Sequence, residues 1–198
     1  MLLDKLRNYR IILGSKSPRR HDLLKGAHIN FEFLNIETDE DYPLDLKSYK
    51  IPLYLCQKKA EAAQIYLDEK TILITADTIV WINNKVINKP VDKEDAYKIL
   101  STLSGKCHEV FTAVYLKSKN KKMTFYVKSK VYFRKLSKKE ISYYIETFKP
   151  YDKAGAYGIQ EWIGYIAIKK VEGSFYNVMG LPISALYKKL EQFININN

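Results

Sequence analysis

The sequence predicts an α/β fold in which helices flank one mixed β-sheet. Segments with strand patterns alternate with segments of helical spacing along the chain, which is typical of this class. The run 71–82 (TILITADTIVWI) is long, apolar and rich in β-branched residues, so it predicts a central strand. Hairpin signals at Asn83-Asn84 and around Asn120 add antiparallel pairs, and the predicted sheet is therefore mixed.

The length and composition indicate one domain over residues 1–198. A chain of 198 residues that is 46% hydrophobic can bury one good core, arranged as one unit or as two closely joined lobes. No apolar run approaches the ~20 residues of a membrane span, and the N-terminus lacks the apolar core of a signal peptide. Two cysteines and three scattered histidines predict neither a disulfide framework nor a metal cluster. We expect a cytoplasmic protein that does not bind membranes.

The formal charge of +11 suits an anionic partner such as a nucleotide, a nucleic acid or an acidic membrane. Many of the lysines fall in the hairpin around Asn120, namely Lys117, Lys119, Lys121, Lys122, Lys128 and Lys130. A solvated, self-repelling face explains these lysines at least as well as a nucleic-acid groove does. We therefore expect no specific nucleic-acid partner.

Near the N-terminus, a strand, a tight turn and a helix start follow one another. Residues 11–13 are apolar β-formers, Ser17 is a good N-cap, and Pro18 is the favoured first helical residue. A helix N-terminus offers unpaired N–H groups and the positive end of a dipole, and Ser15, Arg19 and Arg20 surround it here. The turn predicts a phosphate site, and the alternative is a capped helix whose arginines face water.

A short strand at 31–34 and an acidic loop at 37–41, which contains Glu40, come next. A helix beginning near Pro52 then has apolar residues at three-and-four spacing, and these are Leu53, Cys56, Ala60, Ala63 and Leu67. Lys59 lies beside this apolar seam. Its ammonium group would emerge at the edge of a cleft, or else it is an ordinary surface lysine.

Asp77 interrupts the predicted central strand. A buried carboxylate costs several kcal/mol unless a metal ion, a cation or hydrogen bonds compensate its charge. Asp77 is therefore a candidate functional residue, and the alternative is a turn or bulge between two shorter strands. After the hairpin, Lys89 precedes Pro90, which holds it in an extended conformation.

The remaining elements follow from caps and periodicity. Asp92 caps a helix that ends at Gly105, and Ser137 with Glu140 forms a capping box for a helix that ends at Pro150. Strands are predicted at 109–116, 124–133 and 163–171, irregular segments at 151–160 and 173–182, and a final amphipathic helix from Ile183.

Cations that hold phosphates, together with carboxylates that hold a divalent ion, are what phosphoanhydride hydrolysis requires. The candidate cationic and hydroxyl groups are Ser15, Arg19, Arg20, Lys59 and Lys89, and the candidate carboxylates are Glu40 and Asp77. The sequence contains no GxxxxGK[ST], no GxGxxG and no GxSxG motif, which excludes a P-loop enzyme, a dinucleotide fingerprint and a hydrolase nucleophile elbow.

The segment LGSKSPRR at 13–20 resembles the signature of the Maf (septum formation inhibitor-like) nucleotide pyrophosphatases. The other matching motifs occur in order along nearly the whole chain: Asp39-Glu40, Lys59-Ala60, Ala76-Asp77-Thr78, Lys89-Pro90, Leu103-Ser104-Gly105, GAYGIQ at 155–160 and NVMGLP at 177–182. The GAYGIQ form resembles the branch that acts on dTTP and UTP. Gly14, Cys56 and Glu161-Trp162 depart from the family pattern, and the last pair stands beside Gln160, where it is expected to reshape the base pocket.

The resemblance implies an elongated α/β fold with a central cleft, related to the inosine-triphosphate pyrophosphatases. It implies hydrolysis of nucleoside triphosphates to monophosphate and pyrophosphate, with Mg²⁺ or Mn²⁺, as a house-cleaning activity against non-canonical nucleotides. In that reading Ser15, Arg19, Arg20, Lys59, Lys89 and Gln160 contact the nucleotide. Glu40 and Asp77 hold the metal, with Asp77 as the base.

Two alternatives stay open. One is an inosine/xanthosine-type purine nucleotide pyrophosphatase, and the other is a non-catalytic, nucleic-acid-binding division regulator. A homodimer is an expectation at the level of the family.

Overall fold

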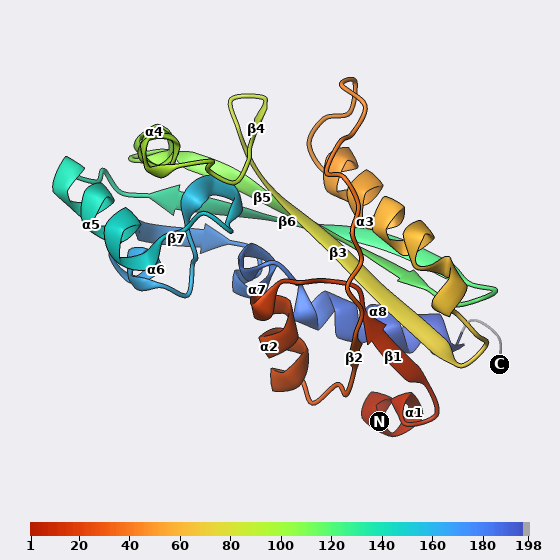
Figure 1. The fold of residues 1–198 in the computed structure, drawn as a ribbon. Helices are drawn as coiled ribbons and strands as arrows, with labels where there is room; N and C mark the ends of the chain where they lie inside the picture. Colours follow the sequence, from red (N-terminus) through yellow and green to blue (C-terminus); the bar gives the residue numbers. More distant parts are fainter. Residues whose placement is uncertain (196–198) are drawn as a thin grey trace.

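A seven-stranded mixed sheet forms the centre of the protein in a computed structural model that describes residues 1–195 (Figure 1). The strand order is β2-β1-β3-β5-β6-β7, and β4 also pairs with β3. β1 runs parallel to β2 and β3, and the other pairs are antiparallel. The strands are β1 Arg10–Leu13, β2 Glu32–Phe33, β3 Thr71–Ile82, β4 Lys85–Ile87, β5 Cys107–Lys117, β6 Lys122–Phe133 and β7 Ile168–Glu172. The predicted mixed sheet is confirmed.

Helices cover both faces of this sheet (Figure 1). They are α1 Leu2–Leu6, α2 Pro18–Gly26, α3 Lys50–Ala62, α4 Lys93–Leu103, α5 Lys138–Phe148, α6 Trp162–Ala167, α7 Phe175–Met179 and α8 Ile183–Asn195, with 3₁₀ turns η1 Gln64–Tyr66 and η2 Ala154–Ala156. The molecule is elongated along β3, β5 and β6, with α4, α5 and α6 gathered at one end and α1, α2 and α8 towards the other (Figure 1). None of the helices within residues 1–195 is long and apolar enough to cross a bilayer.

The alternation of side chains along β3 assigns each residue to one face of the sheet. Ile72 and Ile74 pack in one core with α8 and α2, whereas Leu73 packs with α3 on the opposite face. By the same alternation Asp77 faces α3. At the far end Val80 joins a third core, which α4, α5 and α6 build.

Two different strands pair with the two ends of one edge of β3 and leave its middle without a neighbour on that edge. β1 pairs with residues 71–74 of β3, and β4 pairs with residues 80–82 on the same strand. Residues 75–79 therefore have a sheet neighbour on one side only, where β5 continues without a break. Asp77 lies in this gap, and the polar groups that backbone pairing leaves free there must find other partners.

The structure confirms most of the predicted elements and corrects two. Residues 163–167 are helical, as part of α6, and only 168–172 form the strand that was predicted to begin at Ile163. The β-branched residues suggested a strand, but Ile163 and Ala167, four residues apart, are both buried on one helical face in the core of α4 and α5. The segment 173–182 contains the five-residue helix α7, which is too short to give a periodic signal.

One cap and two boundaries also differ from the prediction. The first turn of α2 begins at Pro18 as predicted, but the Ser17 hydroxyl makes no capping hydrogen bond. The strand predicted at 31–34 is only Glu32–Phe33. The helix predicted to extend to Leu67 ends at Ala62, and Leu67 still packs against the same core from beyond η1.

Gly164 in α6 is expected to tolerate no side chain. A Cβ atom there would overlap with the backbone carbonyl of Ile159, which cannot move as a flexible side chain does. We expect Gly164→Ala to lower the free energy of unfolding by about 2 to 3 kcal/mol. Gly26→Ala is the matched control, because a Cβ at Gly26 meets nothing within 4 Å, and we expect it to be neutral or stabilising by up to about 1 kcal/mol. Urea unfolding compares the two, and equal effects would contradict the packing argument.

Candidate active site

A cavity of about 600 Å³ opens beside the gap in the edge of β3. The turn between β1 and α2, the acidic loop, α3, β3, the segment after β4, the loop after α5 and the end of α7 all contribute to its lining. All the residues predicted for the site line it: Ser15, Arg19, Arg20, Glu40, Lys59, Asp77, Lys89 and Gln160. The structure therefore brings together groups that are up to 145 positions apart in the sequence, the separation from Ser15 to Gln160.

The turn between β1 and α2 forms one side of the cavity. The Ser17 amide (3.3 Å) and the Arg20 guanidinium (2.9 Å) both donate to Ser15 Oγ. Nε2 of His21 lies 2.7 Å from the carbonyl oxygen of Ser15, which fixes the turn from another side. Because two donors occupy the lone pairs of Ser15 Oγ, its O–H is the part of the hydroxyl that can serve a phosphate oxygen.

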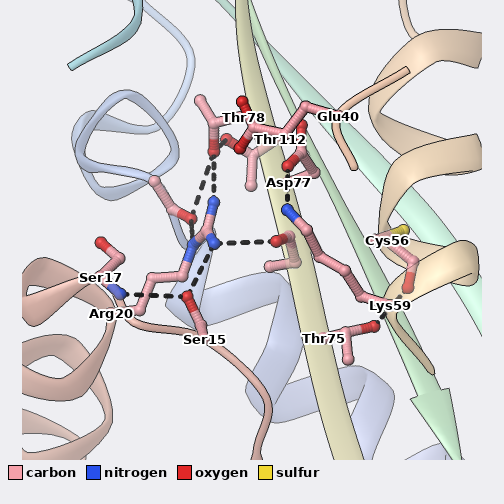
Figure 2. A network of polar contacts seen from close by, with 12 residues as sticks. Ser15, Ser17, Arg20, Glu40, Cys56, Lys59, Thr75, Asp77, Thr78 and Thr112 are labelled. Atoms are coloured by element: carbon pink, nitrogen blue, oxygen red, sulfur yellow. Dashed lines mark hydrogen bonds and ion pairs between the residues drawn. The ribbon is translucent and has the colours of Figure 1, made fainter. Parts of the chain in front are cut away.

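Arg20 joins three parts of the site, as Figure 2 shows. Its Nη1 donates to Ser15 Oγ and to the Ala76 carbonyl (2.8 Å). Ala76 belongs to residues 75–79 of β3, which have a sheet neighbour on the β5 side only. Its Nη2 donates to Thr78 Oγ1 (3.1 Å), and its Nε donates to the carbonyl of Gly180 (2.8 Å). A guanidinium has five N–H groups, and four are used here, so Arg20 mainly holds the turn against β3 and has one N–H left for a ligand.

Asp77 and Lys59 form a buried ion pair. Asp77 is 8% exposed, and its Oδ1 accepts a 2.6 Å hydrogen bond from Lys59 Nζ. Lys59 precedes the buried Ala60 on α3, and Thr75 Oγ1 donates to the carbonyl of Cys56 at 2.6 Å, which fastens α3 to β3 at this point (Figure 2). The lysine offsets the cost of burying the carboxylate. The alternative of a turn or bulge at Asp77 is therefore wrong, because β3 continues through it with regular pairing to β5.

Two further ion pairs cross the cavity. Lys89 Nζ lies 2.7 Å and 3.0 Å from the two carboxylate oxygens of Glu40, and Arg19 Nη1 lies 2.9 Å from Asp152 Oδ2. Burial alone would raise the pKa of Glu40, but the hydrogen bond and charge of Lys89, with the charge of Lys59, hold that pKa below its ordinary value. Glu40 is therefore ionised at neutral pH.

The carboxylates fit a divalent cation that shares its ligands with a substrate. Within residues 1–195 no cluster of three or more His, Cys, Asp or Glu side chains forms a complete metal cage. Glu40 and Asp77 both line the cavity, and Figure 2 shows them in the same part of the site. Mg²⁺ is typically held by one or two carboxylates together with phosphate oxygens and water, so two carboxylates beside a phosphate site are a suitable donor set.

Gln160 lies in the segment 151–160, which the sequence predicted to be irregular. Its Oε1 is buried without a hydrogen-bond partner among the described residues, and its side chain lines the cavity. A buried amide oxygen usually has a donor, so this atom is suited to an N–H group of a ligand.

Glu161 and Trp162, which were expected to reshape the base pocket, contact other residues instead. Glu161 accepts from the Tyr144 hydroxyl and pairs with Lys153, and Trp162 packs edge-on against Tyr143 at 4.9 Å between ring centroids. In the part of the chain that the structure describes, neither residue belongs to the cavity lining. The other departures are also accommodated locally, since the Ile36 side chain fills the space that a Cβ at Gly14 would occupy.

Among the lining residues that sequence reasoning did not predict for the site are Thr78, Asp152 and Lys153. Thr78 follows Asp77 directly, and alternation along the strand would have placed it on the face opposite α3, where Arg20 binds it. Asp152 and Lys153 lie near the start of the segment predicted to be irregular, and the available signal was two adjacent opposite charges before a run of small residues.

Within the described residues, no cysteine or histidine belongs to the cavity lining. Cys107 and His108 point to opposite sides of β5, and burial lowers the pKa of His108 to about 4. Cys56 lies on α3 and packs in the core between this helix and the sheet. Burial raises the pKa of its thiol to about 12, so the thiol is neutral.

Comparison with known proteins assigns this chain to a family. The model of the family described as "Maf-like protein" matches residues 10–193, which is nearly the whole chain. The chain belongs to the Maf family. Among curated Maf proteins, the dTTP/UTP pyrophosphatase of Parabacteroides distasonis is 50% identical over 193 residues, covering 97% of this chain and 100% of that protein.

Two further Maf relatives carry the same name. The dTTP/UTP pyrophosphatase of Porphyromonas gingivalis is 51% identical over 195 residues (97% of this chain, 98% of that one), and that of Flavobacterium johnsoniae is 46% identical over 194 residues (98% and 100%). A solved dITP/XTP pyrophosphatase from Mycobacterium abscessus aligns over 95% of this chain and 98% of its own at a TM-score of 0.41 and 12% identity, a likeness too distant to bear on fold or activity.

Proposed function

We propose that this Maf protein hydrolyses dTTP and UTP to the nucleoside monophosphate and pyrophosphate, and so removes unwanted or modified pyrimidine nucleotides. The observation that carries the proposal is the convergence of the predicted cations and carboxylates on one cavity at the gap in β3. The names of the full-length relatives, at up to 51% identity, support the choice of dTTP and UTP.

The cations and the Ser15 hydroxyl would hold the triphosphate. Lys89 and Glu40 are about half exposed, so their ion pair is weak and a phosphate oxygen can replace the carboxylate as the partner of Lys89. Arg19 and Lys59 approach from other sides of the cavity. Their charges would stabilise the negative charge that develops on the departing pyrophosphate.

Asp77 is the proposed general base. A water molecule adds to the α-phosphorus, the bond from that phosphorus to the oxygen bridging to the β-phosphate breaks, and Asp77 takes the proton of the water. Lys59 binds Oδ1 of Asp77 and so fixes the orientation of the carboxylate. The buried position keeps bulk water from competing for the proton.

Glu40 and Asp77 would hold Mg²⁺ or Mn²⁺. When bound, such an ion neutralises phosphate charge and polarises the phosphorus–oxygen bonds. We expect EDTA to abolish hydrolysis and a Mg²⁺ excess over the chelator to restore it. Dialysis against metal-free buffer followed by titration of Mg²⁺ and Mn²⁺ measures the requirement, and full activity after chelation would contradict a metal role for this pair.

A panel of nucleoside triphosphates with detection of pyrophosphate tests the substrate class. We expect dTTP and UTP to be hydrolysed at least about tenfold more efficiently than dITP and XTP, because an amide such as that of Gln160 is suited to a specific base edge. A preference for the deaminated purines would identify the purine-type alternative instead. Salt-sensitive DNA binding without any hydrolysis would identify the binding protein.

Three earlier expectations stay predictions. They are a single domain over 1–198, a cytoplasmic location and a homodimer. We also continue to expect no specific nucleic-acid partner, because a solvated, self-repelling face explains the lysines of the β5–β6 hairpin.

A further inference from the structure

Arg19 is held from across the cavity by a residue that the proposed reaction does not yet use. Arg19 lies in the first turn of α2, and Asp152 lies 133 positions away in the loop after α5. Arg19 Nη1 donates to Asp152 Oδ2 at 2.9 Å, and both side chains line the cavity. The pair thus connects the turn between β1 and α2 with the end of the molecule that carries Gln160.

A second ion pair, with Lys153, holds Asp152 in place although the Asp152 side chain is 57% exposed. Its second oxygen, Oδ1, accepts a 2.7 Å hydrogen bond from Lys153 Nζ, and Lys153 is only 8% exposed. The same ammonium lies 3.0 Å from Glu161 Oε1. The Tyr144 hydroxyl donates to the other oxygen of Glu161 and accepts from the backbone amide of Gly158.

This chain of contacts ends in a rigid part of the fold. Tyr144 is fully buried, and Gly158 has no room for a side chain because a Cβ there would lie 2.7 Å from Cδ of Glu161. Two cations, Arg19 and Lys153, are balanced by the two carboxylates of Asp152 and Glu161. Lys153 and Glu161 are the largely buried charges of this set, with side chains 10% and 18% exposed, and their pairing holds Lys153 in place because another arrangement would leave a buried charge without compensation.

We propose that Asp152 is a positioning residue that fixes the guanidinium of Arg19 across the cavity for phosphate binding. A planar guanidinium that is held at one nitrogen presents its remaining N–H groups in a defined direction, which reduces the ordering cost when an anion binds. A carboxylate beside a phosphate site also repels the phosphate, so Asp152 is useful there only if positioning outweighs repulsion. This inference rests on the proposed function in one respect, namely that Arg19 binds a phosphate.

Calorimetric titration of inorganic tripolyphosphate into the full chain tests the proposal without requiring hydrolysis. Asp152→Asn keeps an oxygen that accepts from Arg19 and removes the repulsion, so we expect affinity within about twofold of wild type or tighter. Asp152→Ala removes the contact, and we expect affinity about fivefold weaker. We expect Arg19→Ala to bind about tenfold more weakly, and adding Asp152→Ala to it to change affinity by less than about twofold.

Three results would overturn the proposal. They are Asp152→Ala binding as tightly as wild type or more tightly, an equal effect of Asp152→Ala with and without Arg19, and Arg19→Ala binding like wild type. Thermal unfolding monitors the fold, and Asp152→Ser replaces the alanine variant if that variant does not fold. A wild-type protein that hydrolyses no nucleotide refutes the proposed function, whereas non-additive binding in the same protein still supports the positioning role.

Discussion

Asp77→Asn is expected to lower kcat for dTTP by about 10³-fold, with a small change in KM. The amide cannot take a proton from water, and general-base catalysis typically contributes about 10²- to 10⁴-fold. The substitution keeps the size of the side chain and an oxygen that can accept from Lys59, whose Nζ lies 2.6 Å from Oδ1 in the native protein. The cations that bind the phosphates stay in place and Glu40 would still hold the metal ion, so we expect most of the substrate binding to be retained. Steady-state kinetics with pyrophosphate detection measures both constants.

Glu109→Gln is the matched control for this variant. Glu109 lies on β5 directly opposite Trp81 of β3. Its carboxylate is also paired with a lysine, because Lys128 Nζ lies 3.1 Å from its Oε1. It does not line the cavity. We expect unchanged kinetics for Glu109→Gln, because the loss of an exposed ion pair changes stability by less than about 1 kcal/mol. Equal activity of Asp77→Asn and the control would require a base other than Asp77.

Local signals in the sequence predicted the framework because they are physically strong. The apolar run at 71–82, the turn residues Asn83-Asn84 and the capping box of Ser137 with Glu140 each specify a backbone conformation with little help from distant residues. β3 begins and ends where that run does, Asn83 and Asn84 both have positive φ, and both hydrogen bonds of the capping box are present. The family resemblance then predicted which side chains share one site.

The remaining features depend on contacts that no local pattern encodes. The helix at 162–167 forms because Ile163 and Ala167 find a core supplied by α4 and α5, which outweighs the strand propensity of the isoleucines in this segment. The gap in β3 results from two different strands that pair with its two ends. The partners of Arg19 and Arg20 come from positions 133 and up to 160 residues away, so only the fold could show which arginine is free to bind a ligand.

Arg20→Lys is expected to lower the free energy of unfolding by about 4 kcal/mol and kcat by about 10²-fold. The guanidinium serves acceptors on the turn, on β3 and after α7 at once, through three different nitrogens. An ammonium is a single point donor and cannot reach all of them, and a buried acceptor without a donor costs about 1 to 3 kcal/mol. The Arg20 guanidinium joins Ser15 to the carbonyl of Ala76, which has no other strand as a partner. Without that guanidinium, the turn between β1 and α2 would move relative to Asp77.

Arg10→Lys separates this effect from the general difference between the two side chains. Arg10 on β1 also makes several hydrogen bonds, with Nε and Nη2 both donating to Glu32, but the pair is exposed and involves a single partner residue. We expect Arg10→Lys to change the free energy of unfolding by less than about 1 kcal/mol and to leave kcat unchanged. Urea unfolding and steady-state kinetics compare the variants. If Arg20→Lys were as stable and as active as Arg10→Lys, Arg20 would not be the residue that holds the turn against β3. The gap in the sheet would then be stabilised by its remaining neighbours alone.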